Sequence, residues 1–545
     1  MASTFSVQAH RSSDDSFPTE RLSRRHTATD ERLPPEPRPH ANLGRRKSTS
    51  DIKLHSMDFF PTLLRAATLM VTPEKKISKP PSTWRSIRSI IFSSWFNVLL
   101  VFIPISWAVN FALPDQHSLI FVLTFLAIIP LAKLLAYATD ELSIRVGQTL
   151  AGLLNATLGN AVEMIVSIIA LTKCELTIVQ SSLVGSILSN LLLVLGMCFF
   201  AGGMRFSEQG FGQSAVQLNS SLLTISVIAV LLPGAFQMAL QGQPSYNEAS
   251  TDDKILKTSH GVALILLFIY GSYLVFQLFS HKALYNDNNP DIQQTKGYDG
   301  QNPWLQLRLR RRKNAKHVQA PLPVADEEVA SDVTVPPEGA DSDHGSASTE
   351  DSEIEAYMSI PVCLGLLVSV TVLVAVTAEF LVDSISGLTA TGAIGQEFVA
   401  LILLPIVGNA AEHVTAVTVS VKDKLTLSLG VAVGSSIQIA LFVIPFMVTL
   451  AWIMGKRLTL LFDPLESIVL LLSVITVNYT VQDGKSNWLE GMILMCLYLI
   501  VAVTFWFYPG ALRTEMFVIY RGAEFFLRHH RHLRVLEGTV GRTVG

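Results

Sequence analysis

The chain has 545 residues, of which 49% are hydrophobic and only 16% are charged. Because an average soluble domain carries about 25% charged residues, this composition excludes an ordinary soluble domain and indicates a membrane protein. The net charge of −3 and the four scattered cysteines give no sign of a nucleic-acid-binding surface, a disulfide framework or a zinc site.

Residues 1–90 form a polar region rich in Arg, Ser, Thr and Pro. No apolar stretch follows Met1, so this region is interpreted as a disordered tail rather than a signal peptide. The basic run KKISKPPSTWRSIR stands directly before the first apolar segment. By the positive-inside rule, the tail is expected to lie in the cytosol.

Eleven apolar segments follow, each close to the 20 residues or so that a helix needs to cross a bilayer. They lie near residues 91–112, 118–138, 148–171, 177–201, 215–233, 260–279, 357–381, 396–421, 425–454, 464–480 and 488–508. The sequence therefore predicts an all-α polytopic membrane protein with about eleven transmembrane helices. Residues 509–545 would form a C-terminal tail, whose side stays open because its basic run FLRHHRHLR conflicts with an odd number of spans.

A long loop over residues 281–356 separates the sixth span from the seventh. Its first part is basic (RLRRRKNAK) and its second part is strongly acidic, and the basic part places the loop in the cytosol. Acidic blocks are usually just solvated. The alternative is a cation-collecting segment, because carboxylates are the natural ligands of hard divalent cations. Its candidate residues are Glu350, Asp351, Glu353 and Glu355.

The two halves of the chain contain copies of one motif. GNAVEMIVSIIALTKCELTIVQSSLVGSILSN (159–190) aligns without a gap with GNAAEHVTAVTVSVKDKLTLSLGVAVGSSIQI (408–439), and ten of the thirty-two positions are identical. Shared apolar residues alone would mean little, but a shared Gly-Asn-x-x-Glu inside an apolar span is specific. This alignment indicates an internal duplication.

The duplicated motifs lie in the third and eighth spans, so they should cross the membrane in opposite directions. Residues 118–280 and 357–508 would then form two inverted five-helix repeats, with 91–112 as an additional N-terminal helix. Inverted repeats are common in secondary transporters, whose binding site lies where the repeats meet. Helix-weakening residues such as Gly159 and Pro405 predict a local break beside each motif, which is tolerated only at a cavity.

The polar residues of both repeats suit a hard cation. Asn160 and Glu163 share a helix face, as do Asn409 and Glu412. The following spans add further neutral oxygens, from Ser186, Ser435 and Gln438. Two carboxylates with amide and hydroxyl oxygens form a ligand set for Ca²⁺ or Mn²⁺.

The same two carboxylates also predict the counter-ion. Their mutual repulsion and their burial disfavour the doubly ionised form, so protons can replace the cation as a coupled pair. Competition between cation and protons for the same oxygens produces antiport if only loaded states change sides. His413, beside Glu412, could relay protons or serve only in packing.

Two other classes of protein remain to be weighed. A divalent cation channel would also carry polar residues in its spans, although channels rarely need a central two-carboxylate site. An intramembrane hydrolase lacks support, because no Ser–His or paired-Asp motif is present. The sequence therefore indicates a transporter and no enzyme.

The stretches GLLNATLGNAVE, SSLVGSILSNLLLVLG and LPIVGNAAEHVTAV resemble the signature repeats of the calcium/cation–proton exchanger family, within the cation/Ca²⁺ exchanger superfamily. The chain is most similar to fungal vacuolar Ca²⁺/H⁺ exchangers. This resemblance implies eleven spans and uptake of Ca²⁺ from the cytosol into an acidic organelle, across the vacuolar membrane, in exchange for protons.

The resemblance also implies roles for individual residues. The family's paired central glutamates correspond to Glu163 and Glu412, its histidine to His413, and its carboxylate at the end of the second span to Glu141, which would take part in proton coupling. A Na⁺/Ca²⁺ exchanger of the same superfamily is the alternative. His413 and the single carboxylate in each motif favour protons over Na⁺.

Overall fold

A computed structural model describes residues 81–146, 148–241, 247–285, 289–298, 356–390, 392 and 394–509, which all belong to one compact unit. Most of the predicted N-terminal tail and the predicted C-terminal tail from residue 510 lie outside the described residues. The same holds for the predicted cation-collecting residues Glu350, Asp351, Glu353 and Glu355.

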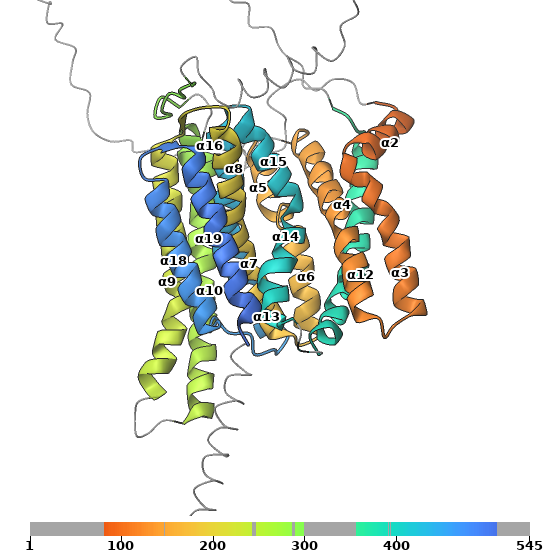
Figure 1. The fold of residues 1–545 in the computed structure, drawn as a ribbon, viewed down its shortest axis with the longest axis vertical. Coiled ribbons are helices and arrows are strands. Elements are labelled where there is room, and N and C mark those ends of the chain that lie inside the picture. Colours follow the sequence, from red (N-terminus) through yellow and green to blue (C-terminus); the bar gives the residue numbers. More distant parts are fainter. Residues whose placement is uncertain are drawn as a thin grey trace, which may run out of the picture. The chain divides into compact units, whose positions relative to one another are not determined.

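The first half of the described chain is almost entirely helical (Figure 1). Its elements are α2 (Thr83–Phe92), η1 (Trp95–Val101), α3 (Phe102–Ala112), α4 (His117–Ser143), α5 (Gln148–Leu158), α6 (Ala161–Thr172), α7 (Leu176–Leu188), η2 (Ser189–Val194), α8 (Leu195–Gly203), β1 (Gln209–Gly210), α9 (Gln213–Gln241), α10 (Glu248–Val275), η3 (Phe276–Ser280) and η4 (Lys282–Tyr285).

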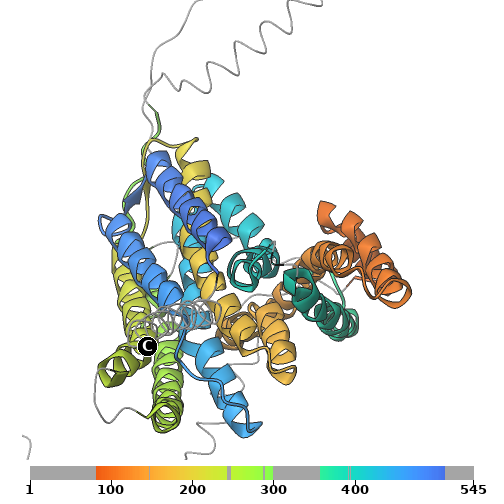
Figure 2. The same cartoon turned by 60° about the horizontal axis from the view of Figure 1, so that its bottom comes forward.

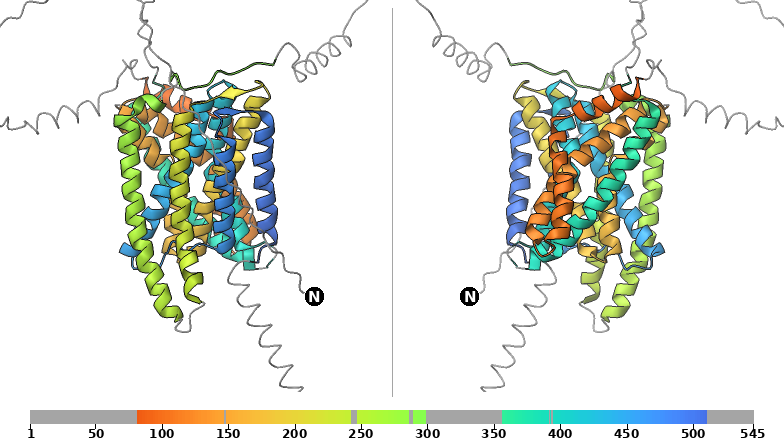
Figure 3. Two further views of the ribbon diagram at one scale, coloured as in Figure 1. Left: turned by 90° about the vertical axis from the view of Figure 1, so that its left-hand side faces the viewer. Right: turned by 90° about the vertical axis from the view of Figure 1, so that its right-hand side faces the viewer.

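The second half follows the same plan. Its elements are α12 (Ile360–Ala390), α13 (Gln396–Phe398), η5 (Val399–Leu403), α14 (Leu404–Gly408), α15 (Ala410–Val421), α16 (Leu425–Gln438), η6 (Ile439–Val443), α17 (Ile444–Ile453), α18 (Pro464–Thr480), β2 (Lys485–Ser486) and α19 (Trp488–Phe507). The long helices of both halves run side by side (Figure 3).

The helices confirm the prediction of a polytopic helical membrane protein. In the described part of the chain, eight helices are long and apolar enough to cross a membrane, and a bent pair, Gln396–Gly408 with Ala410–Val421, makes nine. The two remaining predicted spans correspond to shorter helices. These are the broken pair α5–α6 and the helix α18.

One boundary differs from the prediction, because a helix begins inside the expected disordered tail. Helix α2 starts at Thr83, and the membrane span starts only at Trp95. Ser94 separates the two, since its side chain accepts a hydrogen bond from the backbone N–H of Phe96 and caps the next helix. Helix α2 alternates Arg85 and Arg88 with apolar residues. A search for hydrophobic segments therefore does not detect it.

The two ends of the bundle can be told apart by their loop contacts. On one side, called the ladder side here, β1 pairs with β2 in antiparallel register, with Gln209 opposite Ser486. Asp423, just after α15, accepts a hydrogen bond from Gln209 there. On the opposite, far side, Lys456 after α17 donates to the carbonyl of Thr172 at the end of α6.

These contacts establish the direction of the two repeats. Helix α6 ends on the far side and α15 ends on the ladder side, so the duplicated motifs run in opposite directions, as predicted. Helices α2, α3, α4 and α12 gather at one edge of the bundle (Figure 2). The remaining helices of both repeats interleave, with α7 packed against η5 and α14 of the other repeat.

Candidate cation site between the two repeats

Both motifs lie at a break in a helix, as the sequence predicts. Asn160 stands between α5 and α6 as the N-cap of α6, and Asn409 stands between α14 and α15 as the N-cap of α15. The chain bends by 57° at the second break. Glu163 and Glu412 therefore occupy the first turn of a helix, where the helix dipole favours a negative charge.

Each motif asparagine is bound by the other repeat. The hydroxyl of Ser435 donates to Oδ1 of Asn160 over 3.0 Å, and Nδ2 of Asn409 donates to the hydroxyl of Ser186 over 2.8 Å. These two pairs are equivalent under the duplication. Gln438 adds a third contact, because its Oε1 accepts a 2.7 Å hydrogen bond from Nδ2 of Asn160. The structure thus brings these five predicted neutral residues together.

The two glutamates stand beside these pairs, and each has an unsatisfied oxygen. Oε1 of Glu163 and Oε2 of Glu412 are buried and have no hydrogen-bond partner among the described residues. The Glu163 carboxylate acts electrostatically on Glu412, whose other neighbours are Ser435 and Asn190. A buried, unpaired charge is expensive, so this arrangement requires a cation or protons for neutrality.

The donor set consists of few charged groups and many neutral ones. In the described part of the chain, no three His, Cys, Asp or Glu side chains are grouped to hold a metal. A cation here would therefore need the amide and hydroxyl oxygens as well as the two carboxylates. Such oxygen ligands suit Ca²⁺ or Mn²⁺, and the low number of charges suits an ion that must leave again.

The site is reached from the ladder side. A cavity of about 420 Å³ extends from Glu412 and Gln438 to Asp140 near the ladder-side end of α4. A much smaller cavity of about 20 Å³ lies beside Glu163, closed by apolar residues such as Leu381 and Leu404. The structure therefore has a wide space beside Glu412 and only a narrow space, bordered by apolar side chains, beside Glu163.

His413 lies next to the site but points to a different partner. Its Nε2 is 3.3 Å from the hydroxyl of Ser189 in the π-helical turn η2. No contact with either glutamate carboxylate is recorded for its ring, as expected for a residue that follows Glu412 directly on a helix. A role of His413 in proton transfer thus stays a prediction.

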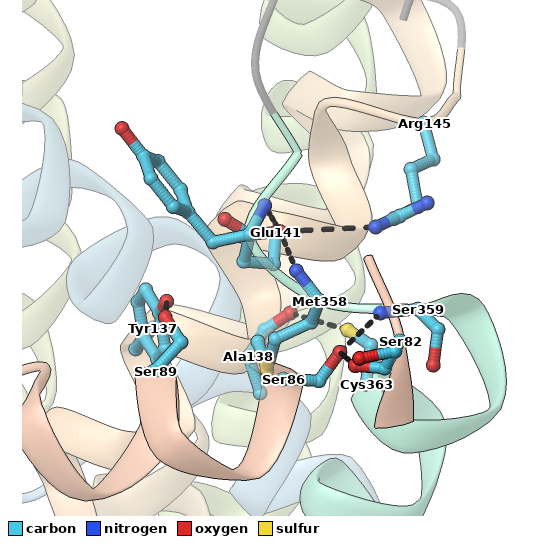
Figure 4. A network of polar contacts seen from close by, with 11 residues as sticks. Ser82, Ser86, Ser89, Tyr137, Ala138, Glu141, Arg145, Met358, Ser359 and Cys363 are labelled. Carbon is cyan, nitrogen blue, oxygen red and sulfur yellow. Dashed lines mark hydrogen bonds and ion pairs between the residues drawn. The ribbon is translucent and has the colours of Figure 1, made fainter. Parts of the chain in front are cut away.

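Glu141 lies apart from the central site, in the network drawn in Figure 4. Its carboxylate accepts hydrogen bonds from the backbone N–H groups of Tyr357 and Met358, both over 3.3 Å. Arg145 lies 3.9 Å from it on the same helix. Glu141 therefore connects the end of α4 with the chain that leaves the acidic segment, while its neighbour Asp140 lines the cavity.

Sequence reasoning missed several polar residues of the site. Asp140, Asn155 and Asn219 line the large cavity, and Asn190 donates to Ser435 over 3.1 Å. The alignment of the repeats gave no signal for Asn190, because its counterpart is Ile439. Asp140 stands directly before Glu141 at the end of a predicted span, where acidic residues are common and say little.

The chain is similar to known transporters over most of its length. Residues 116–279 and 362–507 match the profile of the sodium/calcium exchanger protein family. The vacuolar calcium ion transporter of Cryptococcus neoformans is 50% identical over 508 residues, which cover 86% of this chain and 83% of that protein.

More distant relatives and a solved structure are also similar to this chain. The vacuolar calcium ion transporter of Schizosaccharomyces pombe is 40% identical (77% of this chain, 87% of that protein). The Ca²⁺/H⁺ antiporter of Synechocystis is 38% identical (76% and 98%). The solved structure of native YfkE has 27% identity, a TM-score of 0.55 and coverage of 76% of this chain and 100% of its own.

Proposed function

Because the chain belongs to the sodium/calcium exchanger family, we propose that it is a Ca²⁺/H⁺ antiporter whose single shared site lies between Glu163 and Glu412. It is a transporter and not an enzyme. The observation that carries the proposal is the proximity of two glutamates from inverted repeats, each with one buried and unsatisfied carboxylate oxygen. Two carboxylates balance one divalent cation or two protons.

The exchange follows from competition between Ca²⁺ and protons for the same site. Ca²⁺ entering through the large cavity meets Glu412 first, then gathers Glu163 and the oxygens of Asn160, Asn409, Ser186, Ser435 and Gln438. Protons neutralise the same two carboxylates once the ion has left. A half-filled site leaves a buried charge uncompensated. This cost opposes the conformational change that would turn the site toward the other side of the membrane. The coupling follows from this competition, and Mn²⁺ fits the same oxygen ligands.

The direction of transport follows from the positive charges. Helix α2, which carries Arg85 and Arg88, lies on the ladder side, where Ser86 accepts a hydrogen bond from the backbone N–H of Ser359. Residues 289–298, which precede the basic part of the central loop in the sequence, also lie there. We therefore place the ladder side in the cytosol. The far side then faces an acidic organelle, and the vacuolar membrane agrees with the names of the fungal relatives. Protons enter from the far side and Ca²⁺ from the ladder side.

The acidic segment and Glu141 fit into this scheme. The segment with Glu350, Asp351, Glu353 and Glu355 leads directly to Tyr357, whose N–H group binds Glu141 on the ladder side. We assign the segment to the collection of cytosolic cations. Glu141 would sense protons there, since protonation weakens its hold on the two backbone N–H groups.

The alternative function is Na⁺/Ca²⁺ exchange, which the family profile also covers. Each motif here offers only one carboxylate, and His413 stands beside one of them. Two carboxylates balance one divalent cation, two protons or two Na⁺ ions, and of these the protons also bind an imidazole such as that of His413. We therefore favour protons as the counter-ion.

The test is uptake of radioactive Ca²⁺ into proteoliposomes with an imposed acid-inside pH gradient. We expect Glu163→Gln and Glu412→Gln each to abolish uptake, because a glutamine supplies neither the charge nor the proton. Asp253→Asn is the matched control, since Asp253 is half exposed and pairs with Lys257 in α10, away from both cavities. Normal transport by either glutamine variant, or uptake by the wild type that follows a Na⁺ gradient alone, contradicts the proposal.

A further inference from the structure

Another buried glutamate, besides Glu141, lies outside the central site. Glu466 stands in the first turn of α18 and is 1% exposed. Neither of its carboxylate oxygens has a hydrogen-bond partner among the described residues. It borders neither of the two cavities at the central site. A buried carboxylate without partners is rare and calls for an explanation.

Among the described residues, no positive charge acts on Glu466. The charged groups that act on it are both acidic, Asp463 at the start of α18 and Glu397 of α13, and the hydroxyl of Ser181 in α7 faces it. Tyr508, the nearby titratable hydroxyl, donates to Asp463 over 2.8 Å. The packed elements α7, α9 and η2 contain no charged residue, and the acid of α19, Glu490, caps the opposite end of that helix.

The N–H groups at the start of α18 form no hydrogen bond with this carboxylate. A carboxylate in a first turn could accept the free N–H groups of the helix. Here Oδ1 of Asp463 already accepts from the N–H groups of Leu465 and of Glu466 itself, over 2.8 and 3.3 Å. The geometry therefore suits a neutral, protonated Glu466.

Glu466 lies close to the far side of the membrane. Gln180, next to Ser181, donates to the carbonyls of Thr459 and Leu461 in the link between α17 and α18, which belongs to the far side. Another face of α7 presents Ser182 to the small closed cavity beside Glu163. One helix thus separates Glu466 from the closed half of the central site.

We propose that Glu466 is a proton-binding site on the far side that donates protons to the central carboxylates during transport. This inference rests on protons being the counter-ion. When the far side opens, the proton leaves the carboxyl oxygen of Glu466 for the carboxylate of Glu163, through water that enters with the opening. A proton from the acidic compartment then restores Glu466, so charge and atoms balance without an oxidant or a metal.

Two transport assays on the full chain separate a proton role from a structural one. A positioned proton donor typically contributes 100-fold or more, so we expect Glu466→Gln to slow net Ca²⁺ uptake driven by the pH gradient at least about tenfold. Exchange of Ca²⁺ for Ca²⁺ across the same vesicles moves no protons and should stay unchanged. Glu379→Gln is the matched control, because Glu379 is an exposed far-side acid that pairs with Lys173 over 3.6 Å.

The outcomes discriminate clearly. Unchanged net uptake in Glu466→Gln overturns the proposal, and so does an equal loss of both transport modes in a folded variant, which indicates a structural role. Wild type without uptake driven by the pH gradient refutes the antiport function itself.

Infrared spectroscopy gives a second reading that does not depend on transport. If Glu466 holds a proton, the carboxylic-acid band of the purified wild type loses one component in Glu466→Gln and shifts in Glu466→Asp. The aspartate variant keeps a carboxyl group and serves if the glutamine variant does not fold. A band identical in wild type and Glu466→Asp contradicts the proposal.

Discussion

The two glutamates of the central site have unequal neighbours, although their motifs are duplicated. Gln438, which accepts from Asn160, corresponds to Ser189 in the other repeat, and Ser189 contacts His413 instead. His413 in turn corresponds to an apolar residue, Met164. The repeats therefore supply the same carboxylates in different polar settings.

Gly408 tests how closely Glu163 must be positioned. A β-carbon at Gly408 would lie 2.6 Å from Oε1 of Glu163, so Gly408→Ala forces the carboxylate to move while the fold is kept. A displacement of about 1 Å at a reacting group can cost roughly 100-fold, and we expect Ca²⁺ uptake to fall at least about tenfold. Gly365→Ala is the control, because that position faces open space. Equal uptake by both variants would mean that the placement of Glu163 is not critical.

Site residues could be predicted from the sequence where they occur in both repeats, but not where they occur in only one. Glu163 and Glu412 stand out because the same motif occurs twice inside apolar spans. Glu466 and Asp140 occur once, near span ends, where an acid in contact with water looks the same in the sequence as a buried one. Only the packing of other helices around Glu466 distinguishes the two cases.

A strap of residues 289–298 crosses the ladder side and joins the two repeats. Lys296 pairs with Glu208 over 2.9 Å, and Gln293 donates to the carbonyl of Asp483. Asp291 accepts a 2.7 Å hydrogen bond from the backbone N–H of Ser214 at the start of α9. This N–H group lowers the pKa of the Asp291 carboxyl below its usual range. The strap connects the central loop to the helices around the large cavity.

The strap should loosen in acid. Because the pKa of Asp291 is lowered in the folded state, its contribution is complete above the ordinary aspartate pKa and is lost as the pH falls through the lowered value. We expect amide exchange at residues 207–214 to rise in that acid range in wild type. In Asp291→Ala it should already be raised at neutral pH. Hydrogen–deuterium exchange, corrected for its intrinsic pH dependence, measures this.

The exposed aspartate Asp115 provides the control for this experiment. Asp115→Ala lies on the far side and should leave exchange at residues 207–214 unchanged. Exchange in Asp291→Ala that matches the wild type at every pH would show that the contact with Ser214 does not hold the strap.

At the level of helices, hydropathy predicted the spans but not the contacts that join them. The break at Asn160 was expected from Gly159, and α18 (Pro464–Thr480) has the bounds of the predicted segment 464–480, whereas the start of α2 was not expected. The strap was missed altogether. Its hydrogen bonds join residues more than seventy positions apart, and no local pattern records such a pairing.

Across the whole molecule, the two repeats differ at one pair of equivalent positions: the pair is in close contact in one copy and separated in the other. A β-carbon at Gly185 would lie 2.0 Å from the carbonyl oxygen of Leu401, so α7 and η5 are tightly packed at the closed side. The equivalent residues in the other copy are Gly434 and Gly152. Outside its own helix, no described atom lies within 4 Å of a β-carbon at Gly434, and one at Gly152 would meet the side chain of Leu278 rather than α16. Both glycines line the large cavity. The contact is thus tight between Gly185 and Leu401, and the equivalent contact between Gly434 and Gly152 is absent.

Alternating access would exchange these two states, so Gly152 and Gly434 should approach each other when the ladder side closes. In a variant lacking the four native cysteines, we expect Gly152→Cys with Gly434→Cys to form a disulfide during turnover and to stop transport until a reductant is added. Each single cysteine variant should stay active under the same oxidation. Spin labels at the two positions would measure the approach directly. A pair that stays apart under every combination of Ca²⁺ and pH would mean that the large cavity never closes in this way, and that the repeats do not exchange conformations.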